Sequence, residues 1–483
     1  MKRILLRSAK SPFRVVSHEE FIQQDLAGTN SGNLLFSDAV HKLLLTEQTE
    51  VISNGIKTDC SARRAQQIND EYDVFVVPLA NAFRLDFRTS LDRLSTLIEQ
   101  LTIPVVVVGV GAQVGADYDT AMLRPMEDSV RRFTAAVLDR SASIGVRGEL
   151  TARYLDALGF SNTEIIGCPS MFFYGDTLPE LRHPVRITGE SRIAISLSPD
   201  AIDAGDIVGL ARHACERFPD LMYYAQNLVD AEVLYWGDTS QESGDQPGFP
   251  LQLSHPLLGE NKVRVPVDPV TWISELRSYD FAYGTRIHGN IAALLAGTPS
   301  VVLVHDSRTL ELSRYFELPH RMLRDVPADT HPQELADTAD YAPMLAGHAE
   351  RFSRLSAFLD KNSLENTYSH GDRGAAFDAH LAELDLPPCI GVWDGSDDGG
   401  LRYRLAWLRE QLLAARSAAV QRHAELAKTT AGLKQRNQDL VARLDAMQEQ
   451  LTETEQRVAR IERHPVLRLG RVFRHGVKPF TTR

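Results

Sequence analysis

The sequence predicts an α/β protein made of two doubly wound halves, followed by a C-terminal helical coiled coil. Within the first 180 residues, short apolar runs rich in Val and Ile alternate with helical patterns, which is typical of a parallel sheet covered on both faces. Residues 185–330 repeat this alternation. Beyond the linker near residue 400, apolar residues recur at intervals of seven, which predicts a coiled coil.

The first half, residues 1–180, contains four strand candidates, each a short β-branched run bounded by helical sequence. They are Val74–Leu79, Val105–Val110, Ser143–Val146 and Thr163–Ile166. Ahead of them, Asn30 and Asn33 flank a glycine before an amphipathic helix at Leu34–Leu45. Their amides can hydrogen-bond a ligand that the glycine lets approach the backbone, and a tight turn before the helix explains the pattern equally well.

A glycine-rich loop follows the strand candidate Val105–Val110 and contains Gly111 and Gln113. Gly109 and Gly111 begin a G-x-G pattern, but the next glycine, Gly115, comes four residues later rather than three. The spacing therefore excludes the dinucleotide-binding fingerprint.

The second half, residues 185–330, carries the strand candidates and the turn with the most chemistry. The strand candidates are Ile193–Leu197, Leu221–Ala225, Asp280–Tyr283 and Ser300–Val304. A turn with Arg286 and His288 joins the last two through a small-residue helix, so a cation and an imidazole lie at the carboxyl end of a strand. Helix amides and Arg286 would favour a phosphate or carboxylate there, and His288 could move a proton. An ion pair for Arg286 and a helix cap for His288 would explain the pattern as well.

Residues 331–391 have a helical pattern with one apolar stripe. Its members are Leu345, Phe352, Leu355, Phe358 and Leu359. We expect this segment to pack back onto the two halves. The run Asp394–Gly400, DGSDDGG, then predicts a flexible linker.

Residues 401–463 predict a coiled coil. One heptad position is occupied by Leu405, Leu412, Ala419, Leu426, Leu433, Leu440, Met447, Thr454 and Ile461. The companion position becomes apolar at Leu444, Leu451 and Val458, so the second part of the segment is the better coil. A helix of this length would measure on the order of 90 Å, too long to fold onto one domain. We expect homo-oligomerisation through it, with docking to another protein or a solvated single helix as alternatives.

The last segment, residues 464–483, is basic. It carries Arg468, Arg471, Arg474, Lys478 and Arg483, interleaved with apolar residues and without any acid. A peripheral contact with an anionic membrane and a disordered tail are equally compatible with this composition.

Composition and charge narrow the function classes. The 483 residues, 43% of them hydrophobic, suffice for two domains and an extended segment. A formal net charge of −12 argues against nucleic acid as a partner. The four cysteines form no C-x-x-C pair, so we expect neither a zinc site nor a disulfide framework. Only three apolar residues precede Arg7 and no run approaches roughly 20, so we expect a cytoplasmic location.

The stretch from residue 281 to residue 309 resembles the polysaccharide pyruvyl transferase family. The family pattern is a strand, an R-[LI]-H turn, an Ala-rich helix, G-x-P, an apolar strand and a D-x-K-S-like motif. This sequence matches it at Arg286, Ile287, His288, Gly297, Thr298, Pro299, Val301–Val304 and Asp306. It departs from the pattern at Arg308 and Thr309, which stand where Lys and Ser are usual.

Three further segments carry the same resemblance. Asn30, Gly32 and Asn33 match an N-x-G-[DN] loop, and Gly109–Gln113 matches a G-x-G-A-Q run. Arg147 occupies a V-R-[DE] segment at the end of a strand. Cys168 stands where the family usually has Asp before Pro and a small residue, which argues against a metal or base role there.

The resemblance implies a GT-B-like architecture of two Rossmann-like domains, with the acceptor side in residues 1–180 and the donor side in residues 185–330. It implies catalysis by Arg286 and His288. The implied donor contacts are Arg147, Arg286, Gly284, Thr285, Asp306 and Arg308, and the implied acceptor contacts are Asn30, Asn33, Gly111 and Gln113.

The function implied is transfer of the pyruvyl group of phosphoenolpyruvate to two hydroxyls of a sugar, which forms a ketal in surface polysaccharide biosynthesis. No metal or other cofactor is expected. The saccharide acceptor could be free or lipid-linked. A GT-B glycosyltransferase with a nucleotide-sugar donor and a non-catalytic coiled-coil scaffold of polysaccharide assembly are the alternatives.

Overall fold

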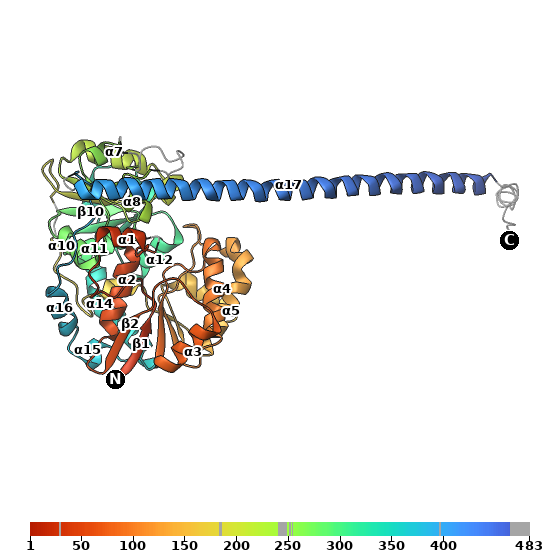
Figure 1. Cartoon of the computed structure of the whole chain (residues 1–483). Helices are drawn as coiled ribbons and strands as arrows, with labels where there is room; N and C mark the ends of the chain where they lie inside the picture. The colour runs from red at the N-terminus through yellow and green to blue at the C-terminus, as the bar shows by residue number, and fades with distance from the viewer. Residues whose placement is uncertain are drawn as a thin grey trace, which may run out of the picture. The chain divides into compact units, whose positions relative to one another are not determined.

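A computed structural model describes residues 1–28, 30–182, 186–239, 249–250, 253, 255–395 and 398–463. The chain divides into two units, residues 1–396 and 397–483. The first unit is an α/β body and the second contains one long helix, as Figure 1 shows. The predicted basic tail, residues 464–483, lies outside the described residues.

The strands confirm every strand predicted from the sequence, with ends shifted by at most two residues. They are β1 (Lys2–Leu6), β2 (Thr49–Ser53), β3 (Val74–Pro78), β4 (Val105–Val108), β5 (Ile144–Val146), β6 (Thr163–Ile165), β7 (Ile193–Ser196), β8 (Leu221–Tyr224), β9 (Val263–Arg264), β10 (Phe281–Gly284), β11 (Ser300–Val304) and β12 (His320–Met322). The sequence analysis missed β1, β2, β9 and β12. These strands are short or begin with polar residues, so their apolar patterns are weak.

The strands of the described residues form parallel sheets. One sheet has the order β2-β1-β3-β4, a second has the order β12-β11-β10-β7-β8-β9, and β5 pairs with β6. A bridge between Val110 and Val146 continues the first sheet from β4 to β5. Because every pairing is parallel, the carboxyl ends of the strands in each sheet meet at one edge. Ligand sites of α/β proteins lie at such edges.

The helices of the first unit supply the crossovers that parallel strands require. They are α1 (His18–Gln23), α2 (Gly32–Leu44), α3 (Ala62–Glu71), α4 (Arg88–Ile98), α5 (Glu127–Leu138), α6 (Glu149–Ala157), α7 (Ile207–Arg217), α8 (Leu228–Trp236), α9 (Pro256–Gly259), α10 (Pro269–Leu276), α11 (Ile287–Leu295), α12 (Ser307–Phe316), α13 (Pro332–Asp337), α14 (Ala342–Lys361), α15 (Thr367–His370) and α16 (Ala375–Ala382). The short 3₁₀ helix η3 (Pro169–Phe172) follows β6.

Both faces of the first sheet are covered, because alternate side chains of a strand point to opposite faces. Leu5 and Val77 belong to a core shared with α4 and α5. Ile4 and Val76 belong to another core, which also contains Ile291 of α11 from the second half. Figure 1 shows α4 and α5 on one side of β1 and β2, with α2 on the other. The two sheets are therefore joined through a common apolar core.

Residues 331–391 pack on this core through α14. Phe352, Leu355, Phe358 and Leu359 are buried in it, as the apolar stripe predicts. Leu345 is 43% exposed, so its inclusion in the stripe was wrong. It lies in the first turn of α14 next to Met344, which is the residue of that turn buried in the core.

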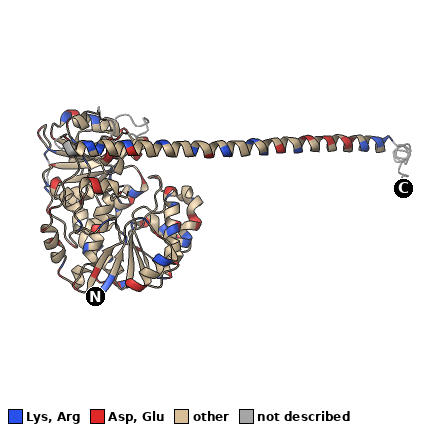
Figure 2. Cartoon of the chain, viewed as in Figure 1, with Lys and Arg blue, Asp and Glu red and all other residues tan. Residues whose placement is uncertain are grey.

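The second unit contains the helix α17 (Asp398–Glu462). Its start includes Asp398 and Gly400, so the end of the predicted linker is helical. Basic and acidic residues are interspersed along its length in Figure 2. The apolar heptad residues are 50–68% exposed at Leu405, Leu412, Leu426, Leu433, Leu440, Leu444, Met447, Leu451, Val458 and Ile461. Among the described residues, no helix is long and apolar enough to cross a membrane.

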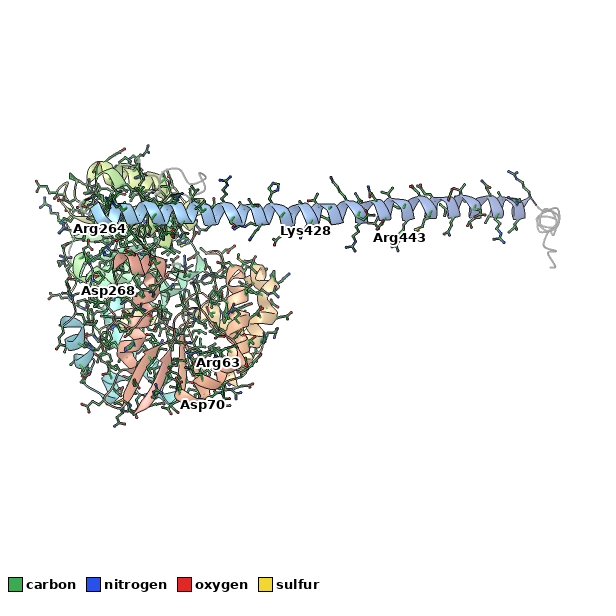
Figure 3. All side chains as sticks on the ribbon, in the orientation of Figure 1. Arg63, Asp70, Arg264, Asp268, Lys428 and Arg443 are labelled. Carbon is green, nitrogen blue, oxygen red and sulfur yellow. The ribbon has the colours of Figure 1, made fainter. Side chains whose placement is uncertain are left out.

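A buried ionic cluster ties α2 to the second half of the first unit. Lys10 Nζ lies 3.1 Å from Asp268 Oδ2, and both side chains are almost inaccessible. Asp268, labelled in Figure 3, caps the N-terminus of α10. Asp38 of α2 is also buried, and its Oδ1 has no hydrogen-bond partner within the described part of the chain. Burial raises the pKa of Asp38 to about 8, although Lys10 opposes the shift.

The raised pKa of Asp38 predicts a specific pH dependence of stability. In the folded protein the Asp38 carboxyl keeps its proton up to about pH 8, whereas in the unfolded chain it releases the proton above about pH 4. The stability that this difference contributes is present at low pH and is lost as the pH rises toward 8. The side chain of Asp38→Asn is neutral at every pH. As the pH rises through this window, the unfolding free energy of the variant should therefore increase relative to that of the parent by up to about 1.4 kcal/mol per pH unit. Denaturant unfolding at pH 5, 6 and 7 measures it.

The matched control is Asp70→Asn, at the exposed position of α3 labelled in Figure 3. Its unfolding free energy should follow the same pH dependence as that of the parent. Parallel pH curves for Asp38→Asn and the parent would show that the Asp38 carboxyl is ionised in the folded protein.

Candidate functional site

A cavity of about 1050 Å³ lies among the carboxyl ends of the strands of both sheets. It is lined from the first half by residues that follow β1, β3 and β5 and by the loop before α2. From the second half, residues that follow β7, β8, β10 and β11 line it. Arg286 and His288, which the sequence predicts in a turn at the end of a strand, both line this cavity.

Arg286 follows β10 and precedes the first residue of α11. Its Nη2 donates to Asn227 Oδ1 at 2.9 Å, while its buried Nε has no partner among the described residues. Burial lowers the pKa of Arg286, and the nearby Asp230 carboxylate opposes the shift. The guanidinium is thus oriented by one amide and retains a donor for a ligand.

Arg147 follows β5 and is only 2% exposed. Its Nε and Nη1 are buried without a partner in the part of the chain that the structure describes. Burial lowers its pKa, and Cys168 and Glu311 oppose the shift. A Cβ at Gly111 would collide with Cδ and Nε of Arg147, so only glycine lets this loop lie against the guanidinium.

Arg308 brings a third guanidinium to the cavity wall. Its Nε lies 3.0 Å from Asp306 Oδ2, an ion pair without hydrogen-bond geometry. Asp306 caps α12, because its Oδ1 accepts from the backbone N and Oγ1 of Thr309, each at 2.9 Å. The hydroxyl of Thr309 therefore serves the helix cap, a role that serine can also fill.

His288 lies among these three arginines and is 8% exposed. Its Nε2 is 3.6 Å from the buried Sγ of Cys168. On the other side, a Cβ at Gly32 would collide with Nδ1, Cβ and Cγ of the ring. Burial, together with the charges of Arg147, Arg308 and Arg286, lowers the pKa of His288 to about 3. The imidazole is thus neutral in the free protein at neutral pH.

Each of the three guanidiniums has an acid of the second half near it. Glu311 of α12 acts on Arg147, Asp230 of α8 acts on Arg286, and Asp306 pairs with Arg308. Glu311 is itself held by Thr151, whose backbone N donates to its Oε1 at 2.9 Å. These acids partly compensate the buried cations, while the guanidinium nitrogens without partners remain available to an anion.

The predicted acceptor residues differ in their placement. Asn30, Asn33 and Gln113 line the cavity, whereas Gly111 lies behind Arg147. The Asn33 amide already donates to the carbonyls of Ala27 and Gly28, and Asn30 Oδ1 accepts from the backbone N of Gly32 at 2.8 Å. Both side chains therefore also shape the loop, as the turn interpretation predicts.

Three of the predicted donor residues do not line the cavity: Gly284, Thr285 and Asp306. Thr285 Oγ1 accepts from the backbone N of Ser198 at 2.7 Å, and a Cβ at Gly284 would collide with the Ser196 carbonyl. These two residues hold β10 against β7. Asp306 acts on the cavity through Arg308 and Arg147.

The sequence analysis missed several residues that line the cavity. They are Arg7, Asp25, Lys57, Asn81, Arg84, Arg93, Asp200, Gln226 and Asn227. Arg7 directly follows β1, a strand that the sequence analysis did not identify. Asn227 comes shortly after the predicted strand Leu221–Ala225, so its place after a strand end was a usable signal. Among the described residues, no group of three or more His, Cys, Asp or Glu could hold a metal ion.

Comparison with known proteins assigns the chain to a family. The model of the family described as polysaccharide pyruvyl transferase matches residues 46–307, more than half of the chain. The chain belongs to the polysaccharide pyruvyl transferase family. This family assignment confirms the resemblance found in the sequence and indicates a transferase acting on polysaccharide. The matched range includes Arg147, Arg286 and His288.

Solved structures give weak likenesses. The S. aureus MnaA–UDP structure shares 12% identity with a TM-score of 0.37, and the match covers 80% of this chain and 99% of that one. The UDP-GlcNAc 2-epimerase of Methanocaldococcus jannaschii shares 10% identity with a TM-score of 0.37, and the match covers 80% of this chain and 100% of that one. The glycosyltransferase SnogD from Streptomyces nogalater shares 13% identity with a TM-score of 0.33, and the match covers 79% of this chain and 99% of that one. At these scores the likenesses carry no argument about function. No curated protein matches this member of the polysaccharide pyruvyl transferase family.

The unpartnered nitrogens of Arg147 predict an anion site. Inorganic phosphate should raise the Tm, because it binds the folded protein and not the unfolded chain. Arg147→Lys should weaken phosphate binding about 10-fold, since a fork of donors is replaced by a point charge. Thermal unfolding over a phosphate series measures the change in Kd.

Arg132→Lys provides the matched control, because Arg132 is a half-exposed surface arginine that pairs with Glu99. It should leave the phosphate dependence of the Tm unchanged. Equal phosphate affinity in the parent and in Arg147→Lys would assign Arg147 a purely structural role.

Proposed function

We propose that this protein transfers the pyruvyl group of phosphoenolpyruvate to two hydroxyls of one sugar and releases phosphate. The observation that carries the proposal is a neutral imidazole, His288, among three guanidiniums, two of which have buried nitrogens that find no partner among the described residues. Phosphoenolpyruvate carries a phosphate and a carboxylate on a carbon skeleton of three atoms. Such a compact double anion fits a cluster of arginines beside a proton carrier.

The donor would lie against Arg147, Arg286 and Arg308. Amides from the first half would hold the sugar, with Asn30, Asn33 and Gln113 as candidates. This arrangement corresponds to a GT-B-like division, with the acceptor side in residues 1–180 and the donor side in residues 185–330. Gly111, Gly284, Thr285 and Asp306 support these contacts from behind the cavity wall.

The first chemical stage adds a sugar O–H across the double bond of the donor. One hydroxyl oxygen bonds to C2, its proton passes to His288, and His288 delivers a proton to the methylene carbon C3. A neutral ring can begin this sequence because it has a free lone pair. The bound phosphate and carboxylate offset the positive charge of the arginines, so the ring becomes more basic when the donor is present.

The second stage closes the ketal. The second hydroxyl oxygen bonds to C2, the C2–O bond to phosphate breaks, and its electron pair leaves with the phosphate. The proton of that hydroxyl passes through His288 to the phosphate oxygen. Arg147, Arg286 and Arg308 stabilise the departing anion, so the chemistry requires no metal or other cofactor.

The proposal is tested by incubating the purified protein with phosphoenolpyruvate and a panel of saccharides, both free and lipid-linked. Phosphate release together with the mass gain of a pyruvyl ketal on the sugar is the expected result. A parallel arm supplies nucleotide sugars. Glycosyl transfer in that arm without pyruvyl transfer would favour the glycosyltransferase alternative, and inactivity in both arms would favour a scaffold.

Variants at the centre of the site should lose turnover and remain folded. His288→Ala and Arg286→Ala should each reduce kcat by at least about 10²-fold, because both groups act on the transition state. Arg286→Ala should also raise the KM for phosphoenolpyruvate. Initial rates of phosphate release measure both constants, with circular dichroism as the check on folding.

His213→Ala, on the partly exposed face of α7, is the matched histidine control and should retain the kinetic constants of the parent. Near-normal turnover in His288→Ala or Arg286→Ala would show that the reaction does not depend on the turn that carries these two residues.

We propose further that α17 associates with a second copy of itself. Leu444, Leu451 and Val458 alternate with Leu440, Met447 and Ile461 at heptad spacing, and all six side chains are at least half exposed. A helix with such an apolar stripe is stabilised when a partner helix covers the stripe. Arginines and acids interspersed along α17 leave the remaining faces polar (Figure 2).

Removal of α17 should separate assembly from chemistry. A chain truncated after Gly391 should fold, keep the turnover of the full chain on a free saccharide, and have a lower mass by light scattering. The reason is that every proposed catalytic and donor-binding group precedes residue 309. Unchanged mass would exclude α17 as the assembly element, and lost turnover in a folded truncation would show that residues after 391 take part in the reaction.

A further inference from the structure

Cys168 is an uncharged polar group beside His288 whose role the proposed reaction leaves unexplained. It directly precedes η3 and is 2% exposed. Its Sγ lies 3.6 Å from His288 Nε2 and 3.0 Å from Ser170 Oγ. The sulfur does not line the cavity, so it contacts the ring from the buried side.

The surroundings of His288 contain no carboxylate that acts directly on the ring among the described residues. The charged groups that face it are Arg147 after β5, Arg286 at the start of α11 and Arg308 in α12. The acids nearby, Glu311, Asp230 and Asp306, act on these arginines. At position 168, where the family pattern has Asp, this chain places a neutral thiol.

The two ring nitrogens have different roles in this geometry. Nε2 points to Cys168, while Nδ1 lies on the side of Gly32, next to the loop with Asn30 and Asn33 that lines the cavity. An imidazole whose Nε2–H donates to sulfur carries its lone pair on Nδ1. The thiol proton can then be donated to Ser170 Oγ.

We propose that Cys168 is a positioning residue, which accepts the Nε2–H proton of His288, fixes the ring with the Nδ1 lone pair toward the ligand, and keeps the ring uncharged until the donor binds. This assignment rests on the proposed function, because the ring must start the reaction as a base. A carboxylate at the same place would hold a charged imidazole, which has no lone pair with which to accept the hydroxyl proton.

The burial of the thiol supports this assignment. Burial raises the pKa of Cys168, so the group is a neutral thiol rather than a thiolate at neutral pH. Sulfur is a weak acceptor, and a weak partner orients the ring without making the charged form favourable. The arginines then dominate the electrostatics of the ring, in agreement with the lowered pKa of His288.

The experiment is a pH titration of the histidine ring signals by NMR on the full-length protein without any substrate. His288→Gln identifies the His288 signals by their loss. In the parent, His288 should not titrate between pH 5 and pH 8. Cys168→Asp should raise its pKa far enough for the ring to titrate within this range, because a carboxylate favours the charged ring. Cys215→Asp, which adds the same charge on α7, is the control and should leave His288 unchanged.

Two neutral variants keep the test independent of the folding of Cys168→Asp. Cys168→Ser retains a polar group and should keep turnover within about 10-fold of the parent, whereas Cys168→Ala should lose about 10 to 100-fold through loss of ring orientation. In both variants the ring should stay uncharged above pH 5. A His288 ring that titrates near its ordinary value in the parent, a pKa in Cys168→Asp equal to that of the parent, or full turnover in Cys168→Ala would each overturn the proposal.

The titration tests the role of Cys168 and the activity assay tests the proposed function, so the two claims can fail independently. If His288 titrates as expected but phosphoenolpyruvate is not consumed, the ring placement holds and the proposed function falls. If pyruvyl transfer is observed and the titration in Cys168→Asp is that of the parent, the proposed function holds and the role of Cys168 is refuted.

Discussion

The gathering of three guanidiniums around one imidazole, with Arg147 and Arg286 buried, is the constraint on which the site depends. A buried cation without a partner costs several kcal/mol, so such a cluster persists only where other parts of the fold offset it. Glu311 of α12, Asp230 of α8 and Asp306 at the N-cap of α12 offset the charge of these arginines, and all three acids belong to the second half. The rest of that half can therefore be understood as the framework that keeps three acids behind three arginines while the cavity side stays unpaired.

Close approach of the backbone from the first half completes this arrangement. Gly32 lies against the ring of His288 and Gly111 lies against the guanidinium of Arg147, and a Cβ at either position would displace the functional side chain. Because α2 starts at Gly32 and contributes to the core shared by both sheets, the packing of that core also fixes the loop against the ring. Stability and geometry of the site are thus coupled through one helix.

The sequence predicted the regular parts of this structure better than the cavity. Apolar runs identified β3, β4, β10 and β11 because buried parallel strands have a strong local signal. Arg286 and His288 were found because they follow such a strand. Arg7 was missed since β1 begins with Lys2 and Arg3 and shows little apolar pattern. Thr285 was expected to touch the donor, but its hydroxyl is used by Ser198, a contact that depends on the pairing of β7 with β10.

The size of the cavity has a consequence for specificity. About 1050 Å³ is at the upper end of the range for small-molecule sites and far exceeds the needs of a compact three-carbon donor. The arginines that would hold the donor line its second-half side together with Arg147, whereas Asn81, Gln113 and the loop with Asn30 line it from the first half. These are uncharged amides, which bond sugar hydroxyls through either the donor or the acceptor end. Under the proposed function, charge and the buried acids would determine donor recognition. Discrimination among sugars would then depend on amide side chains in loops of the first half, which can change without disturbing the arginine cluster.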